Sequence, residues 1–212
     1  MNGEMTIILN FINMAVLASA PLLLATLGEI LTEKSGNLNL GVEGMMFMGA
    51  IASLGAAYSY EQAVKAVGGI PSPLMAAVIA TLAAAAAGAL GALIYAFLVV
   101  TLRANQNVTG LTLTIFGTGF ANFFGELIGK QAGGFVQVSS ATKAMFGNID
   151  FGALSDIPVL GPLLFEYNWM VYFGLLVMFA MAWFLSKSRR GLNLRAVGEN
   201  PATADAAGVN VT

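Results

Sequence analysis

Long apolar stretches separated by short polar segments make up most of the sequence. A hydrocarbon core of about 30 Å requires roughly 20 apolar residues in a helix. Five stretches meet or approach this length, at about residues 5–31, 42–58, 73–102, 108–128 and 167–185. The predicted fold class is therefore all-α: a polytopic transmembrane helix bundle of about five spans with one irregular segment.

The irregular segment is Ser35–Met46, where two Asn, three Gly and one Glu interrupt the apolar pattern. Glycine lets the backbone bend tightly. Exposed peptide groups are tolerated at membrane depth only where protein or water covers them, and broken helices recur at transporter substrate sites. Asn39 and Glu43 are therefore candidates for lining a polar pathway. A cytoplasmic turn that caps the next helix explains the same pattern.

A second polar group, Arg103–Gly110, lies between the third and fourth expected spans. It contains the consecutive amides Asn105, Gln106 and Asn107. Amides offer both hydrogen-bond donors and acceptors, as recognition of a sugar or a base requires. Asn105 and Gln106 are therefore also pathway candidates, with a short, hydrated cytoplasmic loop as the alternative.

Small residues recur at four-residue spacing in two of the expected spans. One row is Ala84, Gly88 and Ala92, and the other is Gly117, Ala121, Gly125 and Gly129. Such rows allow helix backbones to approach closely in lipid. Both rows therefore predict helix contacts.

The end of the chain carries Lys187, Arg189, Arg190 and Arg195, four of the nine basic residues, directly after an apolar run. Positive charge beside a span is retained in the cytoplasm, so residues 187–212 are expected there. Alternation then places Arg103–Asn107 inside and Lys130–Glu166 outside. The small residues after Pro201 predict a short helix that another protein can approach, although a solvated basic tail is the alternative.

Composition excludes several function classes. The chain is 58% hydrophobic and 9% charged, whereas soluble proteins carry about 25% charged residues. It has no Cys and no His, so thiol chemistry and the commonest general base and metal ligand are absent. A phosphate-binding Gly-x-x-x-x-Gly-Lys-Ser/Thr loop is also absent. We expect no catalytic site, metal, cofactor or nucleic-acid partner, and the chain is not predicted to be an enzyme.

Three segments carry a resemblance to a known family. Gly191–Val211 resembles the cytoplasmic coupling loop of bacterial ABC-importer permeases, in the superfamily that carries ribose-type sugars, branched-chain amino acids and nucleosides. Residues 35–46 match the pattern Ser-Gly-x-x-Asn-x-Gly-x-Glu-Gly-Met-Met of its nucleoside-type members. Ala104–Gly110, read as Ala-Asn-Gln-x-Val-x-Gly, is also similar to these members.

The resemblance implies that the final loop docks onto a separate ATPase subunit. Arg190 and Arg195 would pair with acidic groups of the ATPase, and Glu199–Pro201 would start the docking helix. The residues implied in this coupling are Arg190, Gly191, Arg195, Gly198, Glu199, Asn200, Pro201, Ala204 and Gly208. The further partners implied are a second permease subunit, identical or different, an extracytoplasmic binding lipoprotein and the lipid bilayer.

The function implied is ATP-driven import of a nucleoside or simple sugar through a multi-pass protein of the bacterial cell membrane. Import of branched-chain amino acids, and an ATP-independent carrier or channel, remain open as alternatives. We expect one permease domain over residues 1–212, with 187–212 as the coupling loop. Permeases of this superfamily continue with further spans after the loop, so we expect the domain to be incomplete at its C-terminus.

Overall fold

The fold was taken from a computed structural model, which describes residues 3–155 and 157–211. The outermost residues of the expected permease domain, Met1, Asn2 and Thr212, lie outside this part. Regular structure in the described residues consists of helices, plus one isolated antiparallel bridge between Asn148 and Asn168. The predicted all-α fold class is confirmed.

The chain folds into two compact units, and each is described by itself. Unit 1 comprises Met1–Gly36 and Phe146–Thr212, and unit 2 comprises Asn37–Met145. Unit 1 contains α1 (Gly3–Lys34), η2 (Gly152–Leu154), η3 (Gly161–Phe165), α6 (Trp169–Lys187), α7 (Arg189–Glu199) and α8 (Pro201–Ala206). Unit 2 contains α2 (Val42–Ala66), α3 (Pro73–Ala96), η1 (Phe97–Thr101), α4 (Gln106–Gln131) and α5 (Ser140–Ala144). The single permease domain stays a prediction.

Four of the five expected spans correspond to helices that are long and apolar enough to cross a membrane. Within the described residues these are Gly3–Lys34, Pro73–Thr101, Gln106–Gln131 and Trp169–Lys187. Two extend beyond the expected bounds at both ends: α1 covers Gly3–Lys34, which is 32 residues, and α4 covers Gln106–Gln131. The third expected span matches α3 and its continuation into the π-helical turn η1, which ends at Thr101. A 32-residue helix is about 48 Å long at 1.5 Å per residue, so α1 needs tilt or protrusion.

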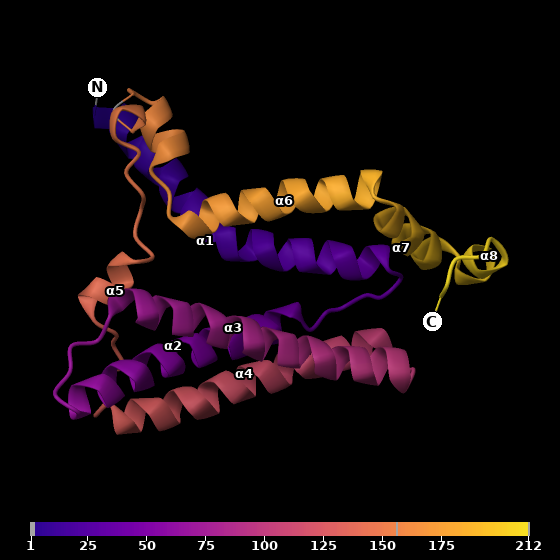
Figure 1. Ribbon diagram of the computed structural model, residues 1–212, viewed down its shortest axis with the longest axis horizontal. Helices are drawn as coiled ribbons and strands as arrows, with labels where there is room; N and C mark the ends of the chain where they lie inside the picture. The colour runs from indigo at the N-terminus through magenta and orange to yellow at the C-terminus, as the bar shows by residue number, and fades with distance from the viewer. Residues whose placement is uncertain (1–2, 156, 212) are drawn as a thin grey trace. The chain divides into compact units, whose positions relative to one another are not determined.

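The remaining expected span, residues 42–58, lies in α2, which is not among these four helices. Three charged residues, Glu43, Glu61 and Lys65, lie on α2. Within unit 2, α2 packs against both α3 and α4, and Figure 1 shows it running between them. A helix flanked by two others presents less surface to lipid, so it tolerates a less apolar sequence.

Glycines bring the backbones of α2 and α4 into direct contact. A Cβ atom placed on Gly117 would lie 2.2 Å from the carbonyl oxygen of Gly44, and one on Gly44 would lie 2.3 Å from that of Leu113. The row containing Gly117 thus makes the close contact that its spacing predicts. The other row does so only in part, because Ala84 packs against Gly49 whereas Gly88 has open space around it.

In unit 1, α6 packs against α1 (Figure 1). A small core forms around Ala20, Tyr167 and Val171, and a Cβ atom on Gly174 would be 3.4 Å from Leu23. Pro21 lies inside α1, where its missing N–H leaves one helical carbonyl without its usual donor. Proline explains the change of direction along α1 that Figure 1 shows.

Six helices begin with a residue whose side chain accepts a hydrogen bond from the backbone N–H three residues later. These residues are Ser72, Asn105, Ser139, Asn168, Ser188 and Asn200, at the starts of α3 to α8. Such side chains satisfy an N–H group that the helix itself leaves without a partner. The start of each of these helices is therefore set by its own sequence.

A buried carboxylate ties the end of α2 to the segment that follows α4. Glu61 is only 1% exposed. Its oxygens accept hydrogen bonds from the Ser139 N–H at 2.9 Å, the Ser139 hydroxyl at 2.8 Å and the Thr142 hydroxyl at 2.6 Å. The Lys65 ammonium lies 3.7 Å away. We call these residues the Glu61 cluster, and it holds α5 against the helices of unit 2.

The Glu61 cluster makes stability depend on pH. Burial alone would raise the pKa of Glu61, but hydrogen bonds from Thr142 and Ser139, together with the Lys65 charge, outweigh it and lower the pKa. A carboxyl whose pKa is lowered by folding stabilises the folded state above the unfolded value of about 4.3. That contribution is lost as the pH falls through the lowered pKa.

We therefore expect the wild-type protein to lose thermal stability below about pH 4 more steeply than a Glu61→Gln variant, which has no charge at this position. Unfolding midpoints in detergent, measured from about pH 7 to about pH 3, test this expectation. The difference between the two curves removes the contribution of other carboxyl groups. Parallel curves would mean that the charged form of Glu61 does not stabilise the fold.

Candidate functional site

The expected coupling loop forms two short helices after α6. Ser188 caps α7, and a Cβ atom on Gly191 would lie 2.0 Å from the carbonyl oxygen of Phe184, so the turn from α6 into α7 requires glycine. Asn200 caps α8, whose first residue is Pro201. A helix therefore starts where the sequence predicts one, because Asn is a favourable cap and Pro suits the first helical position.

The end of α8 is also defined locally. Gly208 adopts a φ of +82°, which only glycine takes without strain. The Gly208 N–H donates to the carbonyl of Asp205 at 2.9 Å, and the Val209 N–H donates to that of Ala204 at 2.9 Å. This pattern closes the helix and satisfies carbonyls that would otherwise lack donors.

The residues implied in coupling divide by exposure. Arg190, Glu199, Asn200, Pro201 and Gly208 are exposed, Arg195 and Gly198 are half-buried, and Gly191 and Ala204 are buried. The side chains of Arg190, Glu199, Asn200 and Pro201 are therefore accessible from outside the protein. The buried pair packs within unit 1. The sequence suggested that the small residues of α8 are open to an approaching protein, but Ala204 is covered by unit 1.

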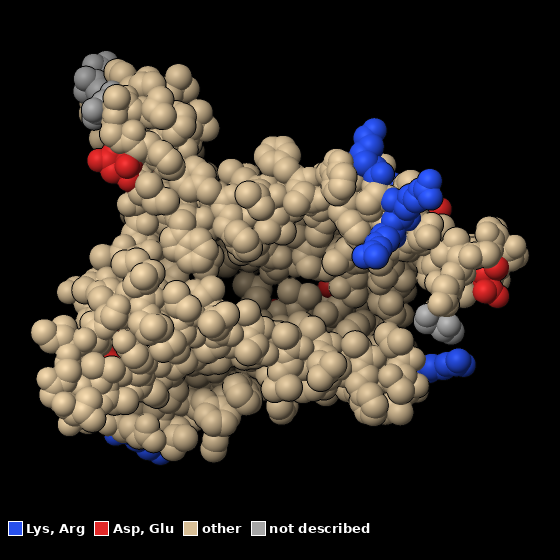
Figure 2. All heavy atoms as spheres, viewed as in Figure 1, with Lys and Arg blue, Asp and Glu red and all other residues tan. Residues whose placement is uncertain are grey.

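Basic side chains gather at the junction of α6 and α7. Lys187 ends α6, and Arg189, Arg190 and Arg195 lie on α7. Figure 2 shows Lys and Arg side chains over this junction. Positive charge directly after a span is typical of the cytoplasmic side, and it would attract an acidic protein surface.

Half-buried Gly198 brings α7 against the end of α1. A Cβ atom placed on Gly198 would lie 2.3 Å from the carbonyl oxygen of Lys34 and 2.9 Å from the backbone nitrogen of Gly36. The contact is therefore made by backbone atoms. Any larger side chain at Gly198 would have to push α7 and the end of α1 apart.

All four pathway candidates lie in unit 2, and two of them, Asn39 and Asn105, bond the backbone close to a helix start. Asn39 is buried, and its side-chain oxygen Oδ1 accepts a hydrogen bond from the Gly41 N–H at 2.9 Å. Asn105 caps α4 through the Val108 N–H at 3.1 Å. These contacts give both amides local roles at the starts of α2 and α4.

Gln106 and Glu43 differ from these two. The Gln106 side chain accepts the Leu38 N–H at 2.8 Å and donates to the side chain of Asn37 at 3.2 Å. Gln106 thereby joins the two polar segments that the sequence singled out. Glu43 is exposed in the first turn of α2, so it is available to solvent or a solute. Lining of a substrate pathway by these four residues remains a prediction.

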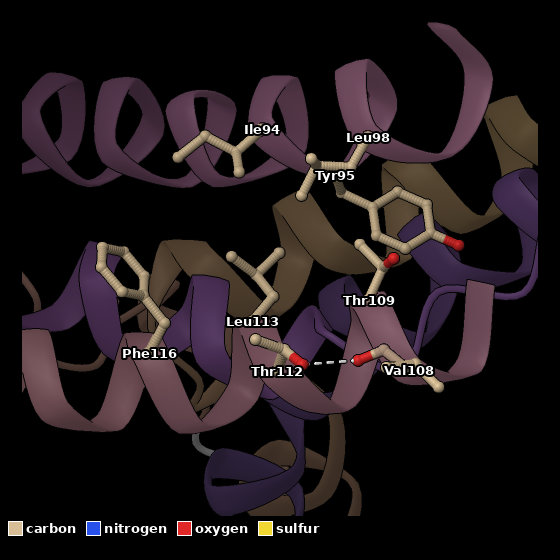
Figure 3. Close-up of a pocket in the computed structure, with 8 residues that line it drawn as sticks. All are labelled: Ile94, Tyr95, Leu98, Val108, Thr109, Thr112, Leu113 and Phe116. Atoms are coloured by element: carbon tan, nitrogen blue, oxygen red, sulfur yellow. Dashed lines mark hydrogen bonds between the residues drawn. The ribbon is translucent and has the colours of Figure 1, made fainter. Parts of the chain in front are cut away.

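A pocket of about 440 Å³ lies within unit 2 and is lined by residues of α3, η1 and α4. Figure 3 shows Ile94, Leu98 and Phe116 at this pocket, with Thr109 and Thr112 as polar groups. The Thr112 hydroxyl donates to the carbonyl of Val108 at 2.8 Å, so it is already used within α4. The pocket is apolar, and none of the four pathway candidates lines it.

The Glu61 cluster is the feature that sequence reasoning missed. An acidic residue after an apolar helix, with Lys65 four residues later, is an ordinary surface pattern. Nothing local indicates that Ser139 and Thr142 complete the site. The described residues contain no group of three Asp, Glu, His or Cys side chains that could hold a metal ion.

Comparison with known proteins assigns the family. The profile described as the permease component of the branched-chain amino acid transport system matches residues 10–212. The chain belongs to this family. With four long apolar helices among its described residues, it is a multi-pass protein of the cell membrane.

Similar proteins include a guanosine ABC transporter permease of Bacillus subtilis, 36% identical over 91% of this chain and 57% of that protein. A putative glucose ABC transporter permease of Haloferax volcanii is 35% identical over 94% of this chain and 55% of that protein. A nucleoside ABC transporter permease of Lactococcus lactis is 31% identical over 91% of this chain and 57% of that protein. The chain thus spans little more than half the length of these curated relatives, and no solved structure was found to match it.

Proposed function

We propose that the chain forms part of the membrane-spanning subunit of an ABC importer that takes up a small solute containing a sugar ring. Family membership is the observation that carries this proposal. The names of three relatives narrow the solute to guanosine, nucleosides and glucose. A sugar ring is the chemistry that these solutes share. Branched-chain amino acids, named in the family description, are the second candidate.

A separate ATPase subunit supplies the energy, and the exposed parts of α7 and α8 receive it. Support comes from the exposed Arg190 and Glu199, and from a basic junction next to a span. A second permease subunit and an extracytoplasmic binding lipoprotein complete the transporter. The alternative, an ATP-independent carrier or channel, would usually place ionisable residues in mid-span. The basic residues here lie at helix ends, in loops and on the short helix α7.

Uptake by cells that express the whole transporter tests the solute. Labelled guanosine, glucose and leucine are supplied separately to cells that carry either the active ATPase subunit or a hydrolysis-deficient variant of it. We expect guanosine or glucose to accumulate only with the active ATPase. Accumulation of leucine alone would favour the second candidate, and uptake that persists without hydrolysis would overturn the ABC importer.

Charge reversal on α7 tests docking of the ATPase. We expect Arg190→Glu to reduce the ATPase that co-purifies with the protein by about tenfold, equivalent to ~1.4 kcal/mol, because an attractive charge pair becomes repulsive. Lys130→Glu is the matched control, since Lys130 is exposed on the segment expected at the opposite membrane side. Equal amounts of ATPase with wild type and Arg190→Glu would contradict the role of Arg190.

A further inference from the structure

We propose that the Gly198–Gly36 contact transmits movement of the coupling loop to the start of α4 through the short segment between α1 and α2. We call residues 35–41 the linker segment. The inference rests on the proposed function, because it assumes that an ATPase moves α7. It assigns to Gly36, Gly198 and Gln106 positioning roles in coupling, and none of the three needs to touch the ATPase or the solute.

The first part of this path is the contact between α7 and the end of α1, within unit 1. The Gly198 position meets backbone atoms of Lys34 and Gly36, and a Cβ atom on Gly36 would in turn lie 3.2 Å from the Cα atom of Gly198. Side chains can change rotamer when pushed, whereas two packed backbones cannot. Movement of α7 must therefore displace the end of α1.

Gly36 gives this end a fixed shape. Its φ of +89° is a conformation that other residues adopt only with strain. Its N–H donates to the carbonyl of Glu33 at 2.9 Å, which closes the last turn of α1. The two compact units meet in sequence directly after it, between Gly36 and Asn37. The covalent chain thus passes from one unit to the other immediately after the residue that α7 contacts.

The second part of the path is formed by contacts within unit 2 that hold residues 37–41 of the linker segment. The Gln106 side chain bonds both Asn37 and the backbone of Leu38. The Tyr95 hydroxyl donates to the carbonyl of Leu38. A Cβ atom on Gly110 would lie 2.7 Å from the backbone nitrogen of Leu40, so the segment also rests directly on the backbone of α4.

These attachments leave almost no slack. Gly36 is held from α7, and the next residues, Asn37 and Leu38, are held from α4. Each residue of extended chain spans at most about 3.6 Å, so a displacement of a few ångströms at Gly36 cannot be absorbed before it reaches Gln106. Gln106 is the first residue of α4 and directly follows the cap Asn105. The first turn of α4 therefore moves with the coupling loop.

Insertion of two glycines between Gly36 and Asn37 tests this path, because it adds up to about 7 Å of slack and removes no contact. The complete transporter is reconstituted with its ATPase and binding protein. The labelled solute is the one that the wild type accumulates, guanosine or glucose. The measured quantity is the ratio of solute taken up to ATP hydrolysed. We expect this ratio to fall at least tenfold while ATPase co-purification is retained. The same insertion between Gly68 and Gly69, in the exposed turn after α2, is the matched control and should leave the ratio unchanged.

Gly198→Ala is the second variant, with Gly28→Ala as its control. Gly28 lies on α1 with no atom within 4 Å of an added Cβ. We expect Gly198→Ala to lower uptake per ATP severalfold with the ATPase still bound. Loss of ATPase binding in Gly198→Ala would instead make Gly198 a docking residue and would overturn the proposed path.

The two proposals fail in distinguishable ways. Wild-type uptake that does not depend on ATP hydrolysis would defeat the ABC importer itself. Wild-type uptake driven by ATP, combined with an unchanged ratio in the linker insertion variant, would defeat only the transmission path. If the insertion variant does not assemble, Gly198→Ala decides the question, because it adds a single methyl group.

Discussion

Replacement of Gly117 by leucine is expected to disrupt unit 2 more than any other single substitution on α4. The Cβ position of Gly117 lies 2.2 Å from the carbonyl oxygen of Gly44, so leucine would force α2 and α4 apart. Overpacking costs about 1–3 kcal/mol where side chains can yield, and here the neighbour is backbone. We expect a loss at or above the upper end of that range, and a fall of roughly 5–10 °C in the unfolding midpoint in detergent.

Gly119→Leu is the control for this substitution. It introduces the same side chain two residues away on α4, at a position where an added Cβ atom has no neighbour within 4 Å. We expect its unfolding midpoint and its yield of monodisperse protein to stay close to those of wild type. If the two variants lost stability equally, glycine content rather than the contact with Gly44 would be responsible.

Substitution of Glu61 by alanine is the second change with a large expected effect. Removing the carboxylate would leave the buried Thr142 donor and the half-buried Ser139 donors of the Glu61 cluster without their acceptor. Loss of one partner from a buried charged network costs about 3–5 kcal/mol. We expect the unfolding midpoint to fall, and protease to cut the segment between α4 and α6 much faster, because α5 loses its anchor.

Glu126→Ala is the matched control because Glu126 also pairs with a lysine four residues later. The Glu126–Lys130 distance is 2.7 Å, shorter than the 3.7 Å of Glu61–Lys65, but both side chains are about 70% exposed. Exposed pairs contribute only about 0.2–1 kcal/mol. A loss of stability in Glu126→Ala as large as that in Glu61→Ala would contradict the importance assigned to burial and to the serine and threonine donors.

Features that depend only on residues close together in the sequence were predictable. The long apolar helices follow from about 20 consecutive apolar residues, and the start of α8 follows from the Asn-Pro pair at 200–201. The α2–α4 contact was foreseeable in part, because the small-residue row marks the correct face of α4. Its partner Gly44 was not identifiable, since the spacing of one helix does not reveal which other helix it meets.

Features that join distant residues were not predictable. Glu61 and Ser139 are 78 positions apart, and neither differs in type from an ordinary surface residue. The amides illustrate a related difficulty. Asn39 was interpreted as a pathway residue because it lies in a polar, glycine-containing break between two apolar stretches, but its side chain satisfies the backbone N–H of Gly41. Composition identifies a polar group in an apolar chain, whereas only the fold specifies its hydrogen-bond partner.

The Ser and Asn residues at the starts of six helices have a consequence for biosynthesis. Each completes its hydrogen bond with a residue only three positions later, so it needs no other part of the protein. A nascent chain that emerges from the ribosome could therefore fix where each of these helices begins before the next one has been synthesised. Helix boundaries would then be established in the order of translation, and the contacts between helices would form afterwards.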